Sequence, residues 1–304
     1  NVLFYDKTYT EANGITVPTT VEGAWSWDEF VSAAKRLTVD LNGKHADEEG
    51  FDPQNIDVYG VADVNPEIMA LSNGGGYFSP DGKELWLSKP ETIEAIQKVA
   101  DLMNVYHVAP IPTTREAIGG GNNPLMTKKV AMHINGQFCL LWYGDFIPTG
   151  EINLGVGVLP KMKNLVTTNS GPAITIFKNT KNPEICKDIL SYFYNTENIL
   201  GNIHKGLWMP SEQSWYEDEA LKAKWVDESN IHPAEYKQGI IDMARDYTVP
   251  NAFYTLGNTN ELYSIINPAL DQVWLGERTA EDVVLNDIMP QIQPIFDEYW
   301  AERQ

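Results

Sequence analysis

The sequence predicts an α/β fold, because short apolar segments typical of strands alternate along the chain with amphipathic segments typical of helices. The 304 residues, 43% hydrophobic and 21% charged, have the composition of a soluble globular protein. This length suffices for two domains or for one large domain with an insertion. The longest apolar runs, such as residues 155–160, fall far short of the roughly 20 residues that span a bilayer.

The first predicted elements are a strand at residues 2–5 and a helix that begins after Ser26. Ser26 and Glu29 are expected to form a capping box, in which the hydroxyl and the carboxylate each satisfy a free backbone N–H group. The helix is predicted to run through Leu37. The side chains expected on its buried face are Trp27, Phe30, Val31 and Ala34.

Residues 58–62 are predicted to form the next strand, with a short helix at 68–71 after it. A second capping box, made by Ser88 and Glu91 around Pro90, predicts a helix that ends near residue 104. The core stripe expected on this helix is Ile93, Ile96, Val99, Ala100 and Met103.

Residues 127–160 are the most informative stretch of the chain. A predicted strand at 130–134 meets the turn signal Asn135-Gly136, and Phe138, Trp142 and Tyr143 follow at once. A second apolar run at 155–159 predicts another strand. Turns at strand ends hold ligands in many α/β proteins, and aromatic rings there offer flat faces to a sugar or a base. The alternative is a strand-to-helix connection whose aromatic residues belong to the core.

The second half of the chain is predicted to contain one strand, at 171–177, and three helical regions. Asn182 is expected to cap a helix through residue 194, Asn260 to cap a second, and Thr279 to start the third. The stripe expected to be buried on the first of these helices is Ile185, Ile189, Leu190 and Phe193. The residues expected to interrupt the last region are Pro290 and Pro294.

The net charge of −20 argues against nucleic acid or an anionic membrane surface as the main partner, because both require basic patches. The two cysteines, Cys139 and Cys186, are expected to be buried free thiols, with a disulfide between them as the alternative. So few cysteines fit either the cytosol or a bacterial exterior. The chain begins at Asn1 without a recognisable signal peptide, so we expect either that one was removed or that the chain is a fragment.

The order of several short motifs resembles that in the bacterial extracellular solute-binding proteins of ABC sugar importers, the maltose-binding-protein-like group. The similar pieces cover most of the chain, and their number and order are more specific than any one of them. They are residues 3–7 (LFYDK), 25–30 (WSWDEF), 40–44 (DLNGK), 73–78 (NGGGYF), 81–83 (DGK), 131–136 (AMHING), 155–160 (GVGVLP), 171–174 (GPAI), 209–211 (MPS) and 276–282 (GERTAED).

The resemblance implies a type II periplasmic-binding-protein-like architecture of two α/β lobes, with a nearly complete second lobe and a partial first lobe. Residues 1–165 and 213–304 would form the second lobe, and residues 166–212 the piece of the first. An opening strand like that at residues 3–5 lies well inside the chain in this family. We therefore expect most of the first lobe to lie upstream, lost or supplied as a separate N-terminal fragment.

The family resemblance also implies where a ligand would bind. Asp63 and Asn65 follow a predicted strand that should point into the cleft, where a carboxylate and an amide can bond to sugar hydroxyls; the alternative is a turn that caps the loop. Phe138 and Trp142 match the place where the family often stacks an aromatic ring on a pyranose, although the spacing of Trp142 departs from the family pattern.

Three further positions are weaker candidates. Trp208 lies near the return crossing between lobes, where hinge packing is the alternative to ligand contact. Asn260 and Tyr263, at a helix start, match a place where the family often has another aromatic residue, and Tyr263 could equally belong to the core.

Signals for catalysis, metals or cofactors are poor. The histidines show no metal-ligand spacing, and the loop that begins at Asp40 lacks the final Glu of an EF-hand. The glycines at 74–76 and 119–121 lack the Lys-Ser/Thr of a phosphate loop, so the second run is expected to be a flexible link. The sequence thus predicts a non-enzymatic, extracytoplasmic carbohydrate-binding protein without cofactors, which delivers its ligand to an ABC permease and whose precursor carries a lipid anchor. The alternatives are a carbohydrate-active hydrolase and a sugar-sensing receptor subunit.

Overall fold

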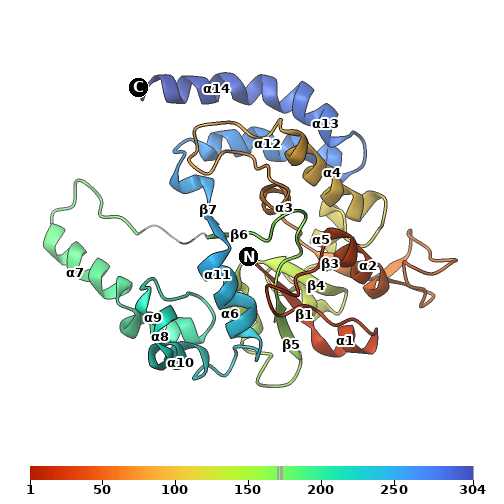
Figure 1. Cartoon of the computed structure of the whole chain (residues 1–304), viewed down its shortest axis with the longest axis horizontal. Coiled ribbons are helices and arrows are strands. Elements are labelled where there is room, and N and C mark those ends of the chain that lie inside the picture. The colour runs from red at the N-terminus through yellow and green to blue at the C-terminus, as the bar shows by residue number, and fades with distance from the viewer. Residues whose placement is uncertain (170, 172–173, 304) are drawn as a thin grey trace.

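A five-stranded mixed sheet carries most of the predicted strands (Figure 1). The computed structural model describes residues 1–169, 171 and 174–303. The strand order is β2-β3-β4-β1-β5, in which β3 and β4 are parallel and the other neighbours antiparallel. The strands are β1 (Val2–Asp6), β2 (Val39–Asp40), β3 (Ile56–Ala62), β4 (Val130–Asn135) and β5 (Leu154–Gly157). The prediction that the runs at 58–62, 130–134 and 155–159 share one sheet is confirmed.

The helices predicted between these strands, α2, α3 and α4, begin and end close to the predicted residues, whereas α1 and α5 were not predicted. The capping box of Ser26 and Glu29 is present, whereas Ser88 makes no cap, because Lys89 is the N-cap residue of α4 and no side chain bonds there. The helices of this half are α1 (Lys7–Ala12), α2 (Trp27–Leu37), α3 (Pro66–Ser72), α4 (Pro90–Asn104), α5 (Pro112–Ile118), η1 (Pro124–Thr127), η2 (Gln137–Cys139) and α6 (Leu140–Tyr143).

The rest of the chain contains a second, two-stranded parallel sheet of β6 (Thr167–Asn169) and β7 (Thr248–Pro250). The predicted strand at 171–177 falls partly outside the described residues, and its described residues form no strand. The helices are α7 (Pro183–Tyr194), α8 (Thr196–His204), α9 (Ser214–Glu217), α10 (Glu219–Val226), η3 (Lys237–Ile241), α11 (Asp242–Asp246), η4 (Ala252–Tyr254), α12 (Thr259–Trp274), α13 (Ala280–Val283), η5 (Val284–Ile288) and α14 (Met289–Ala301).

Successive residues of the central strands face opposite sides of the sheet and enter different apolar clusters. Leu3 packs with residues of α2, α3 and α4, whereas the adjacent Phe4 packs with residues of α6, α8 and α10. A third cluster joins α4 to α12, α13 and α14. The prediction that Pro290 and Pro294 interrupt the last helical region is wrong, because Pro290 lies in the first turn of α14 and Pro294 inside it. Ile292 and Phe296 are buried in this third cluster and hold the helix against it.

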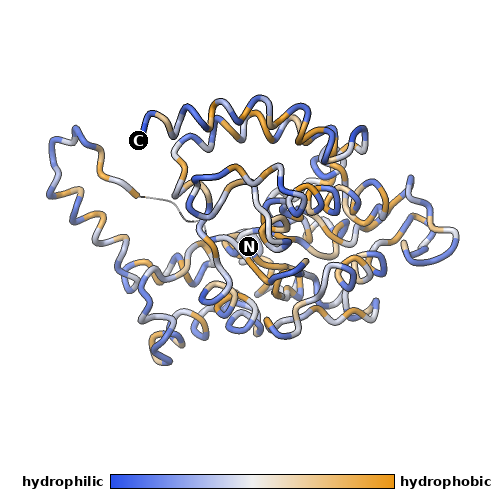
Figure 2. The backbone as a smooth tube through the Cα atoms, turned by 45° about the horizontal axis from the view of Figure 1, so that its top comes forward, coloured by the Kyte–Doolittle hydropathy of each residue, from blue (hydrophilic) through white to orange (hydrophobic). Residues whose placement is uncertain are grey.

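Helix α7 departs from its predicted packing. It projects from the rest of the molecule, and hydrophobic residues recur along it (Figures 1 and 2). Ile185, Ile189 and Phe193 are 58%, 51% and 38% exposed, so the stripe predicted to be buried is largely exposed. By contrast, Ile199 and Ile203 of the following α8 are buried in the cluster that contains Phe4. The division of the chain at 166–212 stays a prediction.

The cysteines are free, Cys139 being buried and Cys186 only partly so. The prediction that both thiols are buried is therefore correct for Cys139 alone. No helix of the described residues is both long and apolar enough to cross a membrane.

Gly60 permits α2 to approach β3 closely. A Cβ atom at Gly60 would lie 2.1 Å from the Ala34 carbonyl oxygen, and the Gly60 N–H donates to Thr38 Oγ1 at 2.9 Å. We expect Gly60→Ala to lower the free energy of unfolding by about 1–3 kcal/mol, the usual cost of overpacking. The matched control is Gly201→Ala in α8, where nothing apart from the neighbouring backbone of the helix lies within 4 Å of the added methyl group. Urea unfolding of both variants checks this, and equal stabilities would contradict it.

His232 is expected to make the protein less stable at acidic pH. Its ring stacks on Tyr236 with 3.9 Å between centroids, and burial lowers its pKa to about 4. The unfolded chain binds this proton near pH 6.5, so stability falls as pH drops from about 6.5 towards 4, by about 3 kcal/mol in full. His232→Phe keeps the stack and cannot titrate. We expect unfolding free energies at pH 7 and 4.5 to differ less for this variant than for the parent, and an equal difference would contradict the assignment.

Candidate functional site

The candidate site lies at the edge where the parallel strands β3 and β4 end. The pair registers Ala62 opposite His133, so the residues that follow the two strands emerge side by side. Asp63 follows β3 and adopts a left-handed φ of 61°, a conformation that Asp tolerates better than most residues. The segment with Phe138 and Trp142 follows β4 as η2 and α6.

The Asp63 carboxylate is held by two basic side chains. Arg115 binds it in a fork, with Nε at 2.9 Å from Oδ1 and Nη2 at 2.9 Å from Oδ2. His133, fully buried, lies with Nε2 at 3.0 Å from Oδ2. Burial acts to raise the pKa of Asp63, but the hydrogen bonds from His133 and Arg115 outweigh it and leave the pKa below its usual value. Burial lowers the pKa of His133, so the imidazole is neutral at pH 7.

These contacts bear on the predicted role of Asp63 as a sugar ligand. Both carboxylate oxygens are already engaged by Arg115, which sequence analysis did not single out. Arg115 also donates to the carbonyl oxygens of Gly119 and Gly121, each at 2.8 Å. The run at 119–121, expected to be a flexible link, is therefore anchored at two of its three residues.

Phe138 and Trp142 form an exposed aromatic pair, which we call the platform. Their rings meet edge to face with 5.9 Å between centroids, and each side chain is 40% exposed. Tyr143, the third aromatic residue of the stretch, is fully buried against Phe4 at 5.6 Å between centroids. The two alternatives predicted for these aromatic residues, core packing and exposure to a ligand, therefore apply to different residues. Tyr143 belongs to the core, and the platform faces solvent.

Asp63 and Trp142 are connected to the same loop. Arg115 ties Asp63 to Gly121, and Asn123, two residues later, donates from Nδ2 to the Trp142 carbonyl oxygen at 3.0 Å. That these residues line one concave surface stays a prediction.

Asn65 makes a local turn, as the alternative to ligand contact expected, but the turn caps a helix and not only the loop. Its Oδ1 accepts from the backbone N–H groups of Glu67 and Ile68 at 2.9 and 3.1 Å, so it caps α3. Glu67 in turn accepts from Tyr263 Oη at 2.8 Å, and burial raises the pKa of Glu67. Tyr263 also packs edge to face against Phe78.

The other two candidates differ in their surroundings. Trp208 packs edge to face on Phe193 of α7, at 6.3 Å between centroids, close to the Gly206 carbonyl that accepts from Gln137 Nε2 at 3.2 Å. Asn260 is exposed and is the second residue of α12, whose N-cap residue is Asn258. Ligand contact by Asn65, Trp208, Asn260 or Tyr263 stays a prediction.

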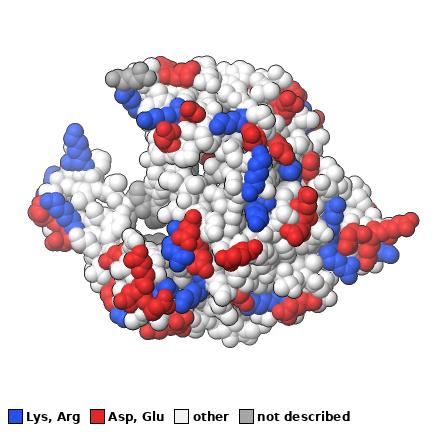
Figure 3. All heavy atoms as spheres, in the orientation of Figure 1, with Lys and Arg blue, Asp and Glu red and all other residues white. Residues whose placement is uncertain are grey.

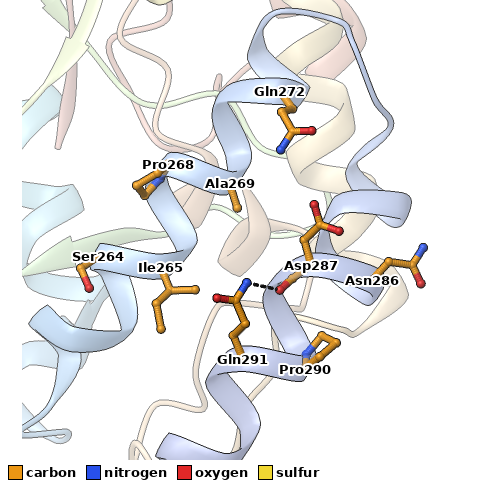
Figure 4. A pocket seen from close by; sticks show the side chains of 9 residues that line it. All are labelled: Ser264, Ile265, Pro268, Ala269, Gln272, Asn286, Asp287, Pro290 and Gln291. Carbon is orange, nitrogen blue, oxygen red and sulfur yellow. Dashed lines mark hydrogen bonds between the residues drawn. The ribbon is translucent and has the colours of Figure 1, made fainter.

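A pocket of about 590 Å³ lies elsewhere, between α12 and the η5–α14 segment, and contains none of the predicted site residues (Figure 4). Among the residues that line it, Gln291 Nε2 donates to the Asp287 backbone oxygen at 2.7 Å. Among residues 1–169, 171 and 174–303, no group of three or more His, Cys, Asp or Glu side chains is placed to hold a metal ion.

Comparison with known proteins identifies the family. The model of the bacterial extracellular solute-binding protein family matches residues 1–199. The chain belongs to this family. The predicted family and the periplasmic-binding-protein-like fold class are thereby confirmed, and members of this family bind solutes outside the cell.

Solved structures of solute-binding proteins share the fold at low sequence identity. An ABC substrate-binding protein from Listeria monocytogenes, in complex with cycloalternan, has a TM-score of 0.75 and 19% identity, over 97% of this chain and 69% of that one. The GacH receptor of Streptomyces glaucescens, solved unliganded and with acarbose, has a TM-score of 0.72 and 17% identity, over 98% and 69%. UgpB from Mycobacterium tuberculosis, in complex with glycerophosphocholine, has a TM-score of 0.70 and 14% identity, over 99% and 69%. No curated protein sequence matches the chain significantly.

Proposed function

We propose that the protein is the carbohydrate-binding component of an ABC transporter, which captures a sugar outside the cytoplasm and delivers it to the permease. The observation that carries this proposal is the exposed platform of Phe138 and Trp142 at the carboxyl edge of β3 and β4. The C–H face of a pyranose is apolar and matches an aromatic face, while its hydroxyl groups require polar neighbours such as those at this edge. The complexes of the structural relatives with cycloalternan and acarbose support a sugar as the ligand.

The proposed mechanism is closure of two lobes about a hinge. β6 begins the piece assigned to the first lobe and pairs in parallel with β7 from Thr167 to Asn169, so we place the hinge at this two-stranded link. Residues 166–212 would belong to the first lobe and the rest of the chain to the second. On the face shown in Figure 3 the surface is hollowed between α7 and α14, and basic side chains are scattered among acidic ones. A lipid anchor on the precursor would hold the protein near the permease.

Saturation-transfer NMR on the whole chain tests the ligand class, because it detects weak binding. The panel contains glucose, maltose, maltotriose, tagatose and glycerophosphocholine. We expect saturation of ring protons of at least one sugar, and unchanged sugar spectra after prolonged incubation. Release of product would favour the hydrolase alternative, and a response to glycerophosphocholine alone would overturn the sugar proposal. A sensing role would instead show as a sugar-dependent complex with a receptor in place of a permease.

A further inference from the structure

We propose that Arg115 is a positioning residue, which fixes the platform of Phe138 and Trp142 by joining Asp63 to the loop that holds the end of α6. This inference rests on the proposed function for its meaning, since the platform is the proposed sugar-binding surface. The contacts that support it lie at the carboxyl edge of β3 and β4.

The Arg115 guanidinium bonds in two directions at once. Towards the sheet it grips both oxygens of Asp63, and towards the loop it reaches the carbonyl oxygens of Gly119 and Gly121, each at 2.8 Å. Its side chain is only 17% exposed. A planar fork can satisfy a carboxylate and two carbonyl groups in fixed geometry, whereas the point charge of a lysine cannot.

The loop at residues 119–121 needs such an anchor because its glycines make the backbone flexible. Gly119, Gly120 and Gly121 have φ values of 75°, 81° and 49°, a conformation that favours glycine. Three consecutive glycines lose more conformational entropy on ordering than other residues would, so bonds to fixed groups are required to hold them. Arg115 supplies two, and Asp63 fixes Arg115 to the sheet.

The loop then holds the helix that carries the platform. α6 spans only Leu140–Tyr143, and the last carbonyl groups of a helix lack partners within it. Asn123 Nδ2 donates to one of them, that of Trp142, at 3.0 Å. A second connection runs from Asp63 through His133 to the hydroxyl of Tyr143, with Nδ1 and Oη 3.3 Å apart. Asp63 is therefore connected to both of the last two residues of α6, to Trp142 through the loop and to Tyr143 through His133.

This arrangement gives Asp63 a role other than the predicted direct contact with sugar. Its carboxylate orients Arg115 and His133, and the residues that meet the ligand are the platform aromatics. The role of the Asn123 side chain is separable from that of Arg115, because Asn123→Asp keeps the shape and removes the donor.

The experiment labels the whole protein with 5-fluorotryptophan and records its ¹⁹F NMR spectrum without ligand. Nine tryptophans give nine resonances, and Trp142→Phe assigns that of Trp142 by its loss. We expect Arg115→Gln, Arg115→Lys and Asn123→Asp each to shift or broaden the Trp142 resonance and to leave most others in place. The matched control is Arg36→Gln, which removes an arginine paired with Glu48 at 3.2 Å on the surface.

The outcomes are distinct. If the Trp142 resonance is unchanged in folded Arg115→Gln and Asn123→Asp, the positioning role is wrong. Should Arg115→Gln fail to fold, Asn123→Asp and its resonance decide alone. Affinity for the sugar found in the NMR panel is expected to fall roughly tenfold in Arg115→Gln, in line with a lost charged hydrogen bond. If the resonance moves but the parent binds no sugar, the positioning role stands and the sugar proposal fails.

Discussion

Replacing both Phe138 and Trp142 with alanine is expected to abolish detectable sugar binding while the protein stays folded. The side chains are each 40% exposed, so their truncation removes little core packing. An aromatic anchor at the centre of a binding surface contributes about 2 kcal/mol or more, which corresponds to roughly 30-fold in affinity for each ring. Loss of both should therefore eliminate the saturation-transfer signal of the bound sugar.

A control of matched exposure separates this effect from general loss of apolar surface. Leu285 is 41% exposed and lies in η5, and Leu285→Ala should leave the saturation-transfer signal unchanged. The melting temperature of the double variant should stay within a few degrees of the parent. Undiminished binding by the folded double variant would show that the platform is not the site.

Local sequence rules predicted the elements that depend on local interactions. The helix capped by Ser26 forms because the hydroxyl and the Glu29 carboxylate meet N–H groups only three residues apart. The same rule fails at Ser88, where Pro90 supplies the helical φ and has no N–H to satisfy, so the helix starts one residue later without a side-chain cap.

The architecture of the site depends on contacts that no local pattern encodes. Arg115 binds Asp63 from 52 residues away, and Asn123 reaches Trp142 across 19. The signal that could have pointed to them is the run of glycines between them, since such a run in a positioned loop implies an anchor. For Asn65, a sugar contact and a local turn were both chemically reasonable. Sequence reasoning did not consider that the free N–H groups at the start of α3 would occupy its side-chain oxygen.

The amphipathic pattern predicted the helix α7 correctly, but it did not predict how α7 packs. The apolar stripe of Ile185, Ile189 and Phe193 predicts burial, because a helix face of this kind is stable when covered. The stripe is largely exposed instead, although Trp208 packs edge to face on Phe193 near its end. A periodic apolar stripe indicates that the helix face needs an apolar partner, but it does not indicate which chain supplies that partner.

We expect that co-expression with the polypeptide encoded immediately upstream will raise both the melting temperature and the sugar affinity of this chain. The relatives in complex with cycloalternan and acarbose are matched over 69% of their length, so part of each has no counterpart here. We propose that an upstream segment forms the rest of the first lobe and covers α7. Full burial of a large apolar side chain contributes roughly 1.5–3 kcal/mol, and because the residues of the stripe are 38–58% exposed, each should contribute about half of that. Closing a second wall around the sugar should add roughly tenfold or more in affinity.

Hydrogen exchange and two variants locate the effect on α7. Amide protons of residues 184–194 of α7 should exchange more slowly in the co-expressed protein than in this chain alone. Ile189→Asp, in the middle of the exposed stripe, should prevent the gain, because it would bury an unpaired carboxylate in the new interface. Lys187→Ala removes an exposed side chain that pairs with Glu184 at 2.9 Å, and it should permit the gain. If the upstream polypeptide changes neither melting temperature nor affinity, the proposed two-lobe division of this chain is wrong.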